Sequence, residues 1–270
     1  MLDIENIYKT FHEGTAHEVR ALQGLNIHID EGSFTVVIGT NGSGKSTLLN
    51  AVSGSFIADR GRVKIDGNDV TRWPEYRRAS LLGRVFQNPF SGTAPSLSIA
   101  ENLALASRRG GSRGLGPIVS ARLHRQMREV VSQLRMGLED RLDTPIGTLS
   151  GGQRQALTLL MATWQKPRLL LLDEHTAALD PKSAEQVVAL SEQVIARDRL
   201  TTLMVTHSMQ QAARLGDRLI MMHQGRVLLS LEGAQKKLVR PEELLDRFES
   251  VRRADLLDES AAEMLARRYV

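Results

Sequence analysis

The octapeptide GTNGSGKS at residues 39–46 constrains the fold more than any other part of the sequence. It matches the pattern G-x-x-x-x-G-K-[ST], and it lies between the apolar run Phe34–Ile38 and a helical pattern over Ser46–Val52. Glycines at this spacing let successive backbone N–H groups curl inward, and the start of the helix adds the positive end of its dipole. The pattern therefore predicts a strand, a phosphate-binding loop and a helix. The alternative is a glycine-rich turn that only caps the helix.

The side chains of this loop suit a nucleotide with bound Mg²⁺. Lys45 can neutralise β- and γ-phosphate oxygens and so act in catalysis, and the Ser46 hydroxyl can bind Mg²⁺. The loop residues expected to contact nucleotide are Gly39, Asn41, Gly42, Ser43, Gly44, Lys45, Ser46 and Thr47.

Two carboxylates follow a second apolar run, in the segment Leu169–Glu174. Parallel sheets bind ligands at the carboxyl ends of their strands, so we expect the pair to face the same phosphates. Asp173 suits Mg²⁺, which prefers oxygen ligands. Glu174 suits a general base that accepts a proton from the water attacking the γ-phosphate. Without the loop at 39–46, a helix-capping pair would be the commoner explanation.

The run LSGGQ at residues 149–153 distinguishes this chain from kinases, GTPases and helicases that share the two features above. It is identical to the signature of ATP-binding cassette (ABC) ATPases, and the chain resembles that family. A capping box of Ser150 and Gln153 is the structural alternative, although two glycines are poor residues for starting a helix. The resemblance implies that Ser150, Gly152 and Gln153 close over ATP held by a second copy of the chain, in a head-to-tail dimer with two-fold symmetry.

Other residues match family positions in the expected order. The resemblance implies that Phe11 stacks on the adenine ring, although a core role is the alternative for a lone phenylalanine. It implies that Gln87 reaches Mg²⁺ and the attacking water, and that His207 contacts the γ-phosphate. The segment 178–180 resembles the loop that crosses the dimer interface, and Asp180-Pro181 is also a good helix start.

The order of sequence patterns predicts an α/β protein. Strand patterns dominate up to a hairpin at Asp66-Gly67, helical patterns occupy residues 98–148 and include an amphipathic stretch over 120–136, and helix and strand alternate from 150 onward. The expected fold is a P-loop NTPase core with a mainly parallel sheet, an N-terminal antiparallel β subdomain and an inserted helical subdomain. We expect an ABC ATPase domain over 1–249, with the helical subdomain at about 88–160, and a C-terminal helical extension over 250–270.

Composition excludes several classes of function. There is no cysteine, so disulfides, thiolate metal sites and thiol nucleophiles are excluded. The formal charge is only +4, which gives no reason to expect nucleic acid as a partner. No apolar run approaches the roughly 20 residues that span a bilayer, and the first residues do not have the pattern of a signal peptide. A cytoplasmic protein is favoured.

For a member of this family, the absence of a membrane span implies a solute pathway in another polypeptide. The chain resembles bacterial ATPases encoded with putative tryptophan/tyrosine uptake systems, including over residues 85–107 and 149–181. The expected function is therefore the ATP-hydrolysing subunit of an ABC transporter for solute import, with amino acids as the suggested solute. It would lie on the inner face of the cell membrane, with a separate permease, a second copy of itself and an extracytoplasmic solute-binding protein as partners. A non-transport ABC ATPase acting on nucleic acid or ribosomes is the alternative, and a P-loop kinase is a third.

Two positions depart from the family pattern. His175 stands where proline is common, and the helix after the signature, at residues 154–161, differs from that of many importers, which have an arginine near position 156. Neither change removes a catalytic group. Residues 88–98 are a candidate docking region for a membrane partner, or an ordinary loop packed on its own lobe.

Overall fold

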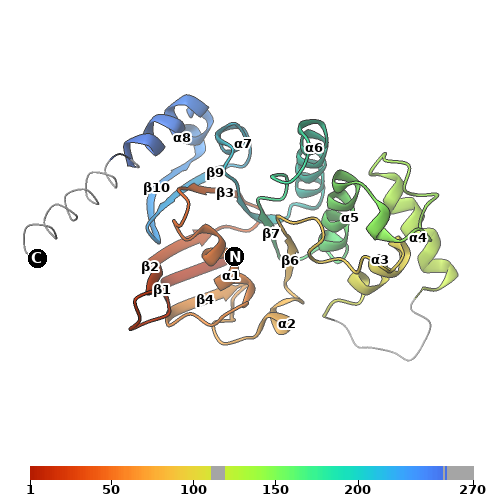
Figure 1. The fold of residues 1–270 in the computed structure, drawn as a ribbon, viewed down its shortest axis with the longest axis horizontal. Helices are drawn as coiled ribbons and strands as arrows, with labels where there is room; N and C mark the ends of the chain where they lie inside the picture. Colours follow the sequence, from red (N-terminus) through yellow and green to blue (C-terminus); the bar gives the residue numbers. More distant parts are fainter. Residues whose placement is uncertain (111–118, 252, 254–270) are drawn as a thin grey trace, which may run out of the picture.

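The computed structural model describes residues 1–110, 119–251 and 253. In this part of the chain the larger sheet has six strands in the order β10-β9-β3-β8-β7-β6 (Figure 1). Every neighbouring pair is parallel except β9 and β10. This confirms the mainly parallel sheet. The strands are β3 (Phe34–Gly39), β6 (Leu82–Val85), β7 (Leu169–Asp173), β8 (Thr201–Val205), β9 (Arg218–His223) and β10 (Arg226–Glu232).

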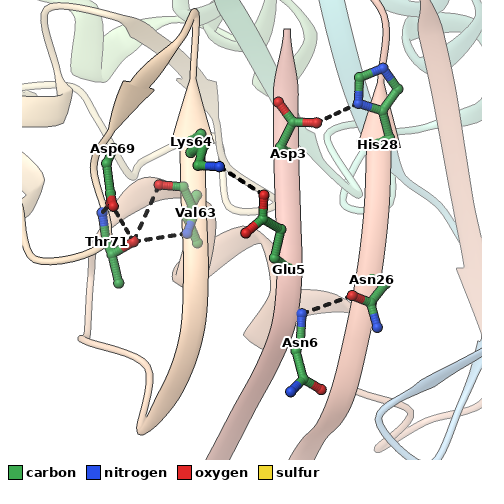
Figure 2. Close-up of polar contacts among 9 residues, drawn as sticks. All are labelled: Asp3, Glu5, Asn6, Asn26, His28, Val63, Lys64, Asp69 and Thr71. Carbon is green, nitrogen blue, oxygen red and sulfur yellow. Dashed lines mark hydrogen bonds and ion pairs between the residues drawn. The ribbon is translucent and has the colours of Figure 1, made fainter.

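A second, antiparallel sheet is built from the N-terminal residues, as expected. Its order is β2-β1-β4-β5, and the strands are β1 (Leu2–Phe11), β2 (Val19–Ile29), β4 (Arg60–Ile65) and β5 (Asn68–Asp69). The predicted hairpin turn is present, with both Asp66 and Gly67 at positive φ. Figure 2 shows polar contacts that join these strands side by side, among them Lys64 with Glu5 and His28 with Asp3.

Helix α1 (Lys45–Ser53) and the antiparallel sheet share a core with one face of the parallel sheet. Strand β7 illustrates the arrangement, because Leu169 and Leu171 belong to this core while Leu170 and Leu172 belong to the core on the other face. Successive side chains of a strand point to opposite faces, so an uninterrupted apolar run fits a strand that is covered on both sides.

The second face of the parallel sheet is covered by helices. They are α5 (Gly151–Thr163), α6 (Pro181–Asp198) and α7 (Met209–Arg214). Each contributes to the second core, through Leu159, Val188 and Ala212 respectively. Two short helices, α2 (Glu75–Arg78) and α8 (Gly233–Leu238), contribute no residue to these two cores.

Helices inserted between β6 and β7 form the part of the molecule farthest from β1 and β2 in Figure 1. They are α3 (Ile99–Ser107), α4 (Ala121–Ser132), the 3₁₀ turn η1 (Ile146–Thr148) and α5. They have a core of their own, which includes Leu103, Val131 and Leu157. Helix α4 ends at Ser132, four residues before the end that the amphipathic pattern over 120–136 predicts. Arg135 adopts φ of 53°, which a continuing helix does not allow.

Residues 241–251 are helical at the other end of the chain. Of the expected extension over 250–270, only residues 250, 251 and 253 belong to the described part of the protein. The remainder of that prediction lies outside it.

Candidate nucleotide site

The predicted phosphate loop connects β3 to α1 and is held between two other segments. Gly42 and Gly44 have φ of 75° and 96°, in the left-handed region that favours glycine. A Cβ atom at Gly44 would lie 2.5 Å from the carbonyl oxygen of Ala21 on β2. The N–H group of Gly225, in the β9–β10 turn, donates to the carbonyl oxygen of Ser43 at 3.0 Å. Both glycines therefore supply the left-handed backbone of the loop, and Gly44 also allows it to pack against β2.

The first turn of α1 has no side-chain cap. Its N-cap residue is Gly44, and no side chain there accepts a hydrogen bond from the first turn. Helices α3, α4, α5 and α6 each begin with a serine or aspartate side chain that accepts such a bond. N–H groups at a helix start need acceptors, and the helix dipole favours an anion there. The start of α1 therefore fits a phosphate group.

Lys45 lies buried beneath this loop. Its Nζ atom donates to the carbonyl oxygens of Gly39 and Thr40 at 2.9 and 2.8 Å. Burial lowers the pKa of Lys45, while the nearby carboxylates of Glu174 and Asp173 favour the charged form. Lys45 therefore lies close enough to Glu174 and Asp173 for both carboxylates to act on its pKa. Asn41 and Ser46 are exposed at the loop, and Thr47 is partly exposed.

Asp173 ends β7, and one of its two carboxylate oxygens already accepts a hydrogen bond from the protein. Its Oδ2 atom accepts a hydrogen bond from Arg84 Nη2 at 3.1 Å, and both side chains are mostly buried. Burial raises the pKa of Asp173, and the bond from Arg84 acts against that rise. Arg84 was not among the residues expected in the site. The sequence does contain a signal for it. The other residues of 82–85 are leucine, glycine and valine, and an arginine buried in such a strand needs polar partners.

Glu174 and His207 follow adjacent strands and lie close together. Oε2 of Glu174 is 3.4 Å from Nδ1 of His207. Glu174 adopts φ of 43°, and its N–H group still donates to the carbonyl oxygen of Val205 on β8 at 2.9 Å. The unusual backbone conformation therefore turns the chain at the end of β7 while Glu174 stays bonded to the neighbouring strand.

Gln211 on α7 joins the two segments that carry this pair, and sequence reasoning did not identify it. Its Oε1 atom accepts from Thr206 Oγ1 at 2.8 Å, and its Nε2 atom donates to Thr176 Oγ1 at 3.2 Å. Thr206 precedes His207 in the sequence, and Thr176 lies two residues after Glu174. A single side chain therefore ties both segments to the start of α7.

Gln87 is exposed just beyond the end of β6. The residue before it is bonded to the helical part of the molecule, because Gln155 Nε2 on α5 donates to the carbonyl oxygen of Phe86 at 3.0 Å. The structure thus places Gln87 at the junction between the parallel sheet and the inserted helices. In the neighbouring candidate docking region, Phe90 is exposed, with its ring 3.9 Å from the guanidinium carbon of Arg154.

The signature residues form the start of α5, and the capping box considered above is present. Ser150 Oγ accepts from the N–H group of Gln153 at 3.3 Å, and Gln153 Oε1 accepts from that of Ser150 at 3.2 Å. Gly152 has a packing role within the chain, because a Cβ atom there would lie 2.8 Å from Cβ of Ser183 on α6. Asp180 caps α6, with Pro181 at its first position, as expected.

Phe11 ends β1, opposite Val19 of β2. Its ring meets that of Phe56 edge to face, with centroids 5.5 Å apart, and Lys9 Nζ lies 5.4 Å from its centre. The ring is partly exposed and belongs to none of the described core clusters.

The structure brings some of the predicted residues together and leaves others apart. The loop, Lys45, Asp173, Glu174 and His207 gather at the carboxyl ends of β3, β7 and β8, which lie together in the sheet order. The signature residues contact their own helix and α6. The ring of Phe11 contacts Phe56 and Lys9. The described contacts therefore do not join the signature or Phe11 to the loop and the acidic pair.

The predicted metal ligands are of the type that a hard cation prefers. Ser46, Gln87 and Asp173 offer hydroxyl, amide and carboxylate oxygens, the type of ligand that Mg²⁺ binds together with water and phosphate. Among the described residues there is no cluster of three histidine, cysteine or acidic side chains that could hold a metal without such help.

The described helices also include none with the length and apolarity needed to cross a bilayer.

Comparisons with known proteins agree with this geometry. Residues 22–177 match the family model described as ABC transporter. A tyrosine transport ATP-binding protein of Clostridioides difficile is 40% identical over 249 residues, which cover 92% of this chain and 99% of the relative. The chain also resembles the solved dimeric cassette MJ0796 in a post-hydrolysis state with ADP and Pi, at a TM-score of 0.74 and 28% identity over 86% of this chain and 98% of the other. A third similar protein is cbiO1 of Clostridium perfringens, part of the transporter complex cbiONQ, at a TM-score of 0.70 and 26% identity over 94% of both chains.

Proposed function

This chain belongs to the ABC transporter family as an ATP-binding ATPase cassette, and we propose that its ATP hydrolysis powers solute import through a separate membrane permease. The observation that carries the proposal is the uncapped start of α1 with Lys45, set beside Asp173 and Glu174 at the ends of the same parallel sheet. An anion site next to two carboxylates fits a nucleotide that binds with a divalent cation. The proposal assigns residues 1–249 to one ATPase domain, with its helical subdomain at about 88–160.

In this proposal the phosphates bind over the loop at 39–47. Lys45 moves its donors from the loop carbonyls to the β and γ oxygens, and Ser46, Asp173 and Gln87 hold Mg²⁺ directly or through water. The bound cation offsets negative charge on the phosphates. Phe11 supports the adenine ring from the end of β1 in the antiparallel sheet.

Glu174 is the proposed general base. Its carboxylate accepts the proton of the attacking water, and His207 at 3.4 Å holds that carboxylate and contacts the γ-phosphate. Gln87, at the junction with the helical part, positions the same water. These roles require a geometry in which the sheet ends and the inserted helices close around one nucleotide.

A second copy of the chain completes each site in this proposal. Ser150, Gly152 and Gln153 of one copy contact the phosphates bound by the other, in a head-to-tail dimer. Ser150 and Gly151 are exposed at the start of α5, which leaves this end of the helix accessible to a second copy, while the capping box bonds Ser150 to Gln153 within the chain.

The Glu174→Gln variant tests the catalytic part. We expect ATP hydrolysis to fall by at least about 10²-fold while ATP converts the protein to a dimer in gel filtration. Glu129→Gln, on the exposed face of α4, is the matched control and should behave as the wild type. A variant that stayed monomeric with ATP, or that kept wild-type turnover, would contradict the proposal.

The transport part rests on the family and on the similarity to the tyrosine transport protein. We propose an amino acid as the solute, a permease and an extracytoplasmic solute-binding protein as partners, and a position on the cytoplasmic face of the membrane. Purification of the chain from membranes with its bound partners, followed by reconstitution in vesicles, tests this. ATP-dependent uptake of tyrosine or tryptophan supports it, and recovery of ribosomes or DNA in place of a permease rejects it.

A further inference from the structure

Arg84 connects three parts of the proposed metal site. Its Nη2 atom donates to Asn50 Oδ1 at 2.8 Å and to Asp173 Oδ2 at 3.1 Å, and its Nη1 atom donates to Ser53 Oγ at 3.1 Å. The guanidinium carbon also lies 4.6 Å from the centre of the Phe86 ring. One planar group therefore joins β6, the end of β7 and α1.

The contacts of Arg84 with α1 lie on the helix face that also carries Ser46. Residues 46, 50 and 53 are spaced by four and three positions, so their side chains share one side of the helix. Asn50 and Ser53 occupy the later turns of α1, and Ser46 occupies the first. Arg84 thereby links α1, which presents the proposed Mg²⁺ ligand Ser46, to Asp173, a second of the proposed ligands.

We propose that Arg84 is a positioning residue for Mg²⁺ binding, which holds Asp173 and α1 in the arrangement that the cation requires. Arg84 occupies Oδ2 of Asp173 and so orients Oδ1 for the metal or its water. A planar donor that bonds Asp173 and Asn50 through Nη2 and Ser53 through Nη1 suits this task better than a point charge, because it fixes direction as well as distance. The inference rests on the proposed nucleotide site and assigns it one more residue.

A purely electrostatic role predicts the opposite effect of mutation. Arg84 carries a positive charge beside the site of a dication, so its removal should strengthen Mg²⁺ binding if charge were its only contribution. A positioning role predicts weaker binding, because residues that orient a metal ligand typically contribute about 10- to 100-fold in affinity. The sign of the change therefore distinguishes the two explanations.

The experiment measures the dissociation constant of ADP by calorimetry with excess Mg²⁺ and again with EDTA. ADP is used because the protein does not consume it. The ratio of the two constants reports the contribution of the metal. The variants are Arg84→Gln, Arg84→Lys and Asn50→Ala, and Arg77→Gln on the exposed surface of α2 is the matched control. Asn50→Ala leaves the charge near Asp173 intact, so it keeps the test valid if Arg84→Gln folds poorly.

We expect the Mg²⁺ contribution to fall by about 10-fold in Arg84→Gln and in Arg84→Lys, and by a smaller factor in Asn50→Ala. ADP binding in EDTA should stay within about two-fold of the wild type, and Arg77→Gln should change neither constant. An unchanged or increased contribution in both Arg84 variants would overturn the inference. A wild type that bound ADP no better with Mg²⁺ than with EDTA would instead reject the Mg²⁺ part of the proposed function.

Discussion

His207 Nδ1 lies 3.4 Å from Glu174 Oε2, although the two residues follow different strands of the parallel sheet. The distance depends on the pairing of β7 with β8, in which Asp173 stands opposite Val205. A parallel register aligns the strand ends, and the two residues that follow them meet as a result.

Replacement of His207 by alanine should lower kcat for ATP hydrolysis by about 10²-fold and leave the dissociation constant of ATP within about two-fold. The reason is that His207 contacts Glu174 and, in the proposed site, only the γ-phosphate, whereas affinity comes from the loop and Lys45. Steady-state turnover and equilibrium binding check the two values. His17→Ala, on the exposed surface, is the control, and equal losses in both quantities for His207→Ala would contradict the prediction.

Gln211→Ala should affect both stability and turnover. The variant loses two hydrogen bonds, to Thr206 and Thr176, which contribute about 1 kcal/mol each to the free energy of unfolding. Because these bonds hold the segments of His207 and Glu174, kcat should fall while ATP affinity stays near that of the wild type. Urea unfolding and steady-state kinetics measure these effects. Gln210→Ala, on the exposed neighbour, should change neither, and wild-type kcat in Gln211→Ala would exclude the positioning role.

Gly152→Ala should destabilise the chain in the absence of any nucleotide. The new Cβ atom would lie 2.8 Å from Cβ of Ser183, and such overpacking typically costs about 1–3 kcal/mol. Gly151→Ala is the matched control, since its nearest neighbour is the flexible tip of Leu179 at 3.2 Å. Urea unfolding of the monomer makes the comparison. The double variant Gly152→Ala/Ser183→Gly should recover most of the loss, and no recovery would show that the strain arises elsewhere.

His28 should make a small pH-dependent contribution to stability. Its ring lies between Asp3 and Asp30, at 2.5 and 3.0 Å, and the first of these contacts is drawn in Figure 2. Hydrogen bonds to Asp3 and then to Asp30 raise the pKa of His28 above its ordinary value of 6.5. Because the folded pKa is the higher one, the stabilisation is fully present below about pH 6.5 and is lost as the pH rises through the folded pKa.

The His28 side chain is 56% exposed, so solvent screening limits the effect to about 0.5 kcal/mol or less. The difference in unfolding free energy between wild type and His28→Gln should therefore be larger at about pH 5.5 than at about pH 8.5. His17→Gln serves as the control. A difference that grew with pH would have the wrong sign for this interaction.

Local patterns predicted much of the fold and part of the site. The loop at 39–46, the apolar run that ends in Asp173 and Glu174, and the turn at Asp66-Gly67 are contiguous segments, so residue types at short spacings were enough to predict them. The end of α4 was predicted too late, because an amphipathic pattern continues past Ser132 although the backbone turns away.

The sequence by itself determined the chemistry of this protein, because phosphate, Mg²⁺ and proton acceptors require specific residue types at short spacings. The tertiary structure alone decided which side chains hold those groups in place. Arg84 and Asp173 are 89 residues apart, and Gly152 and Ser183 belong to different helices. Such contacts arise from the order of strands and the packing of helices, so no local pattern around either partner encodes them.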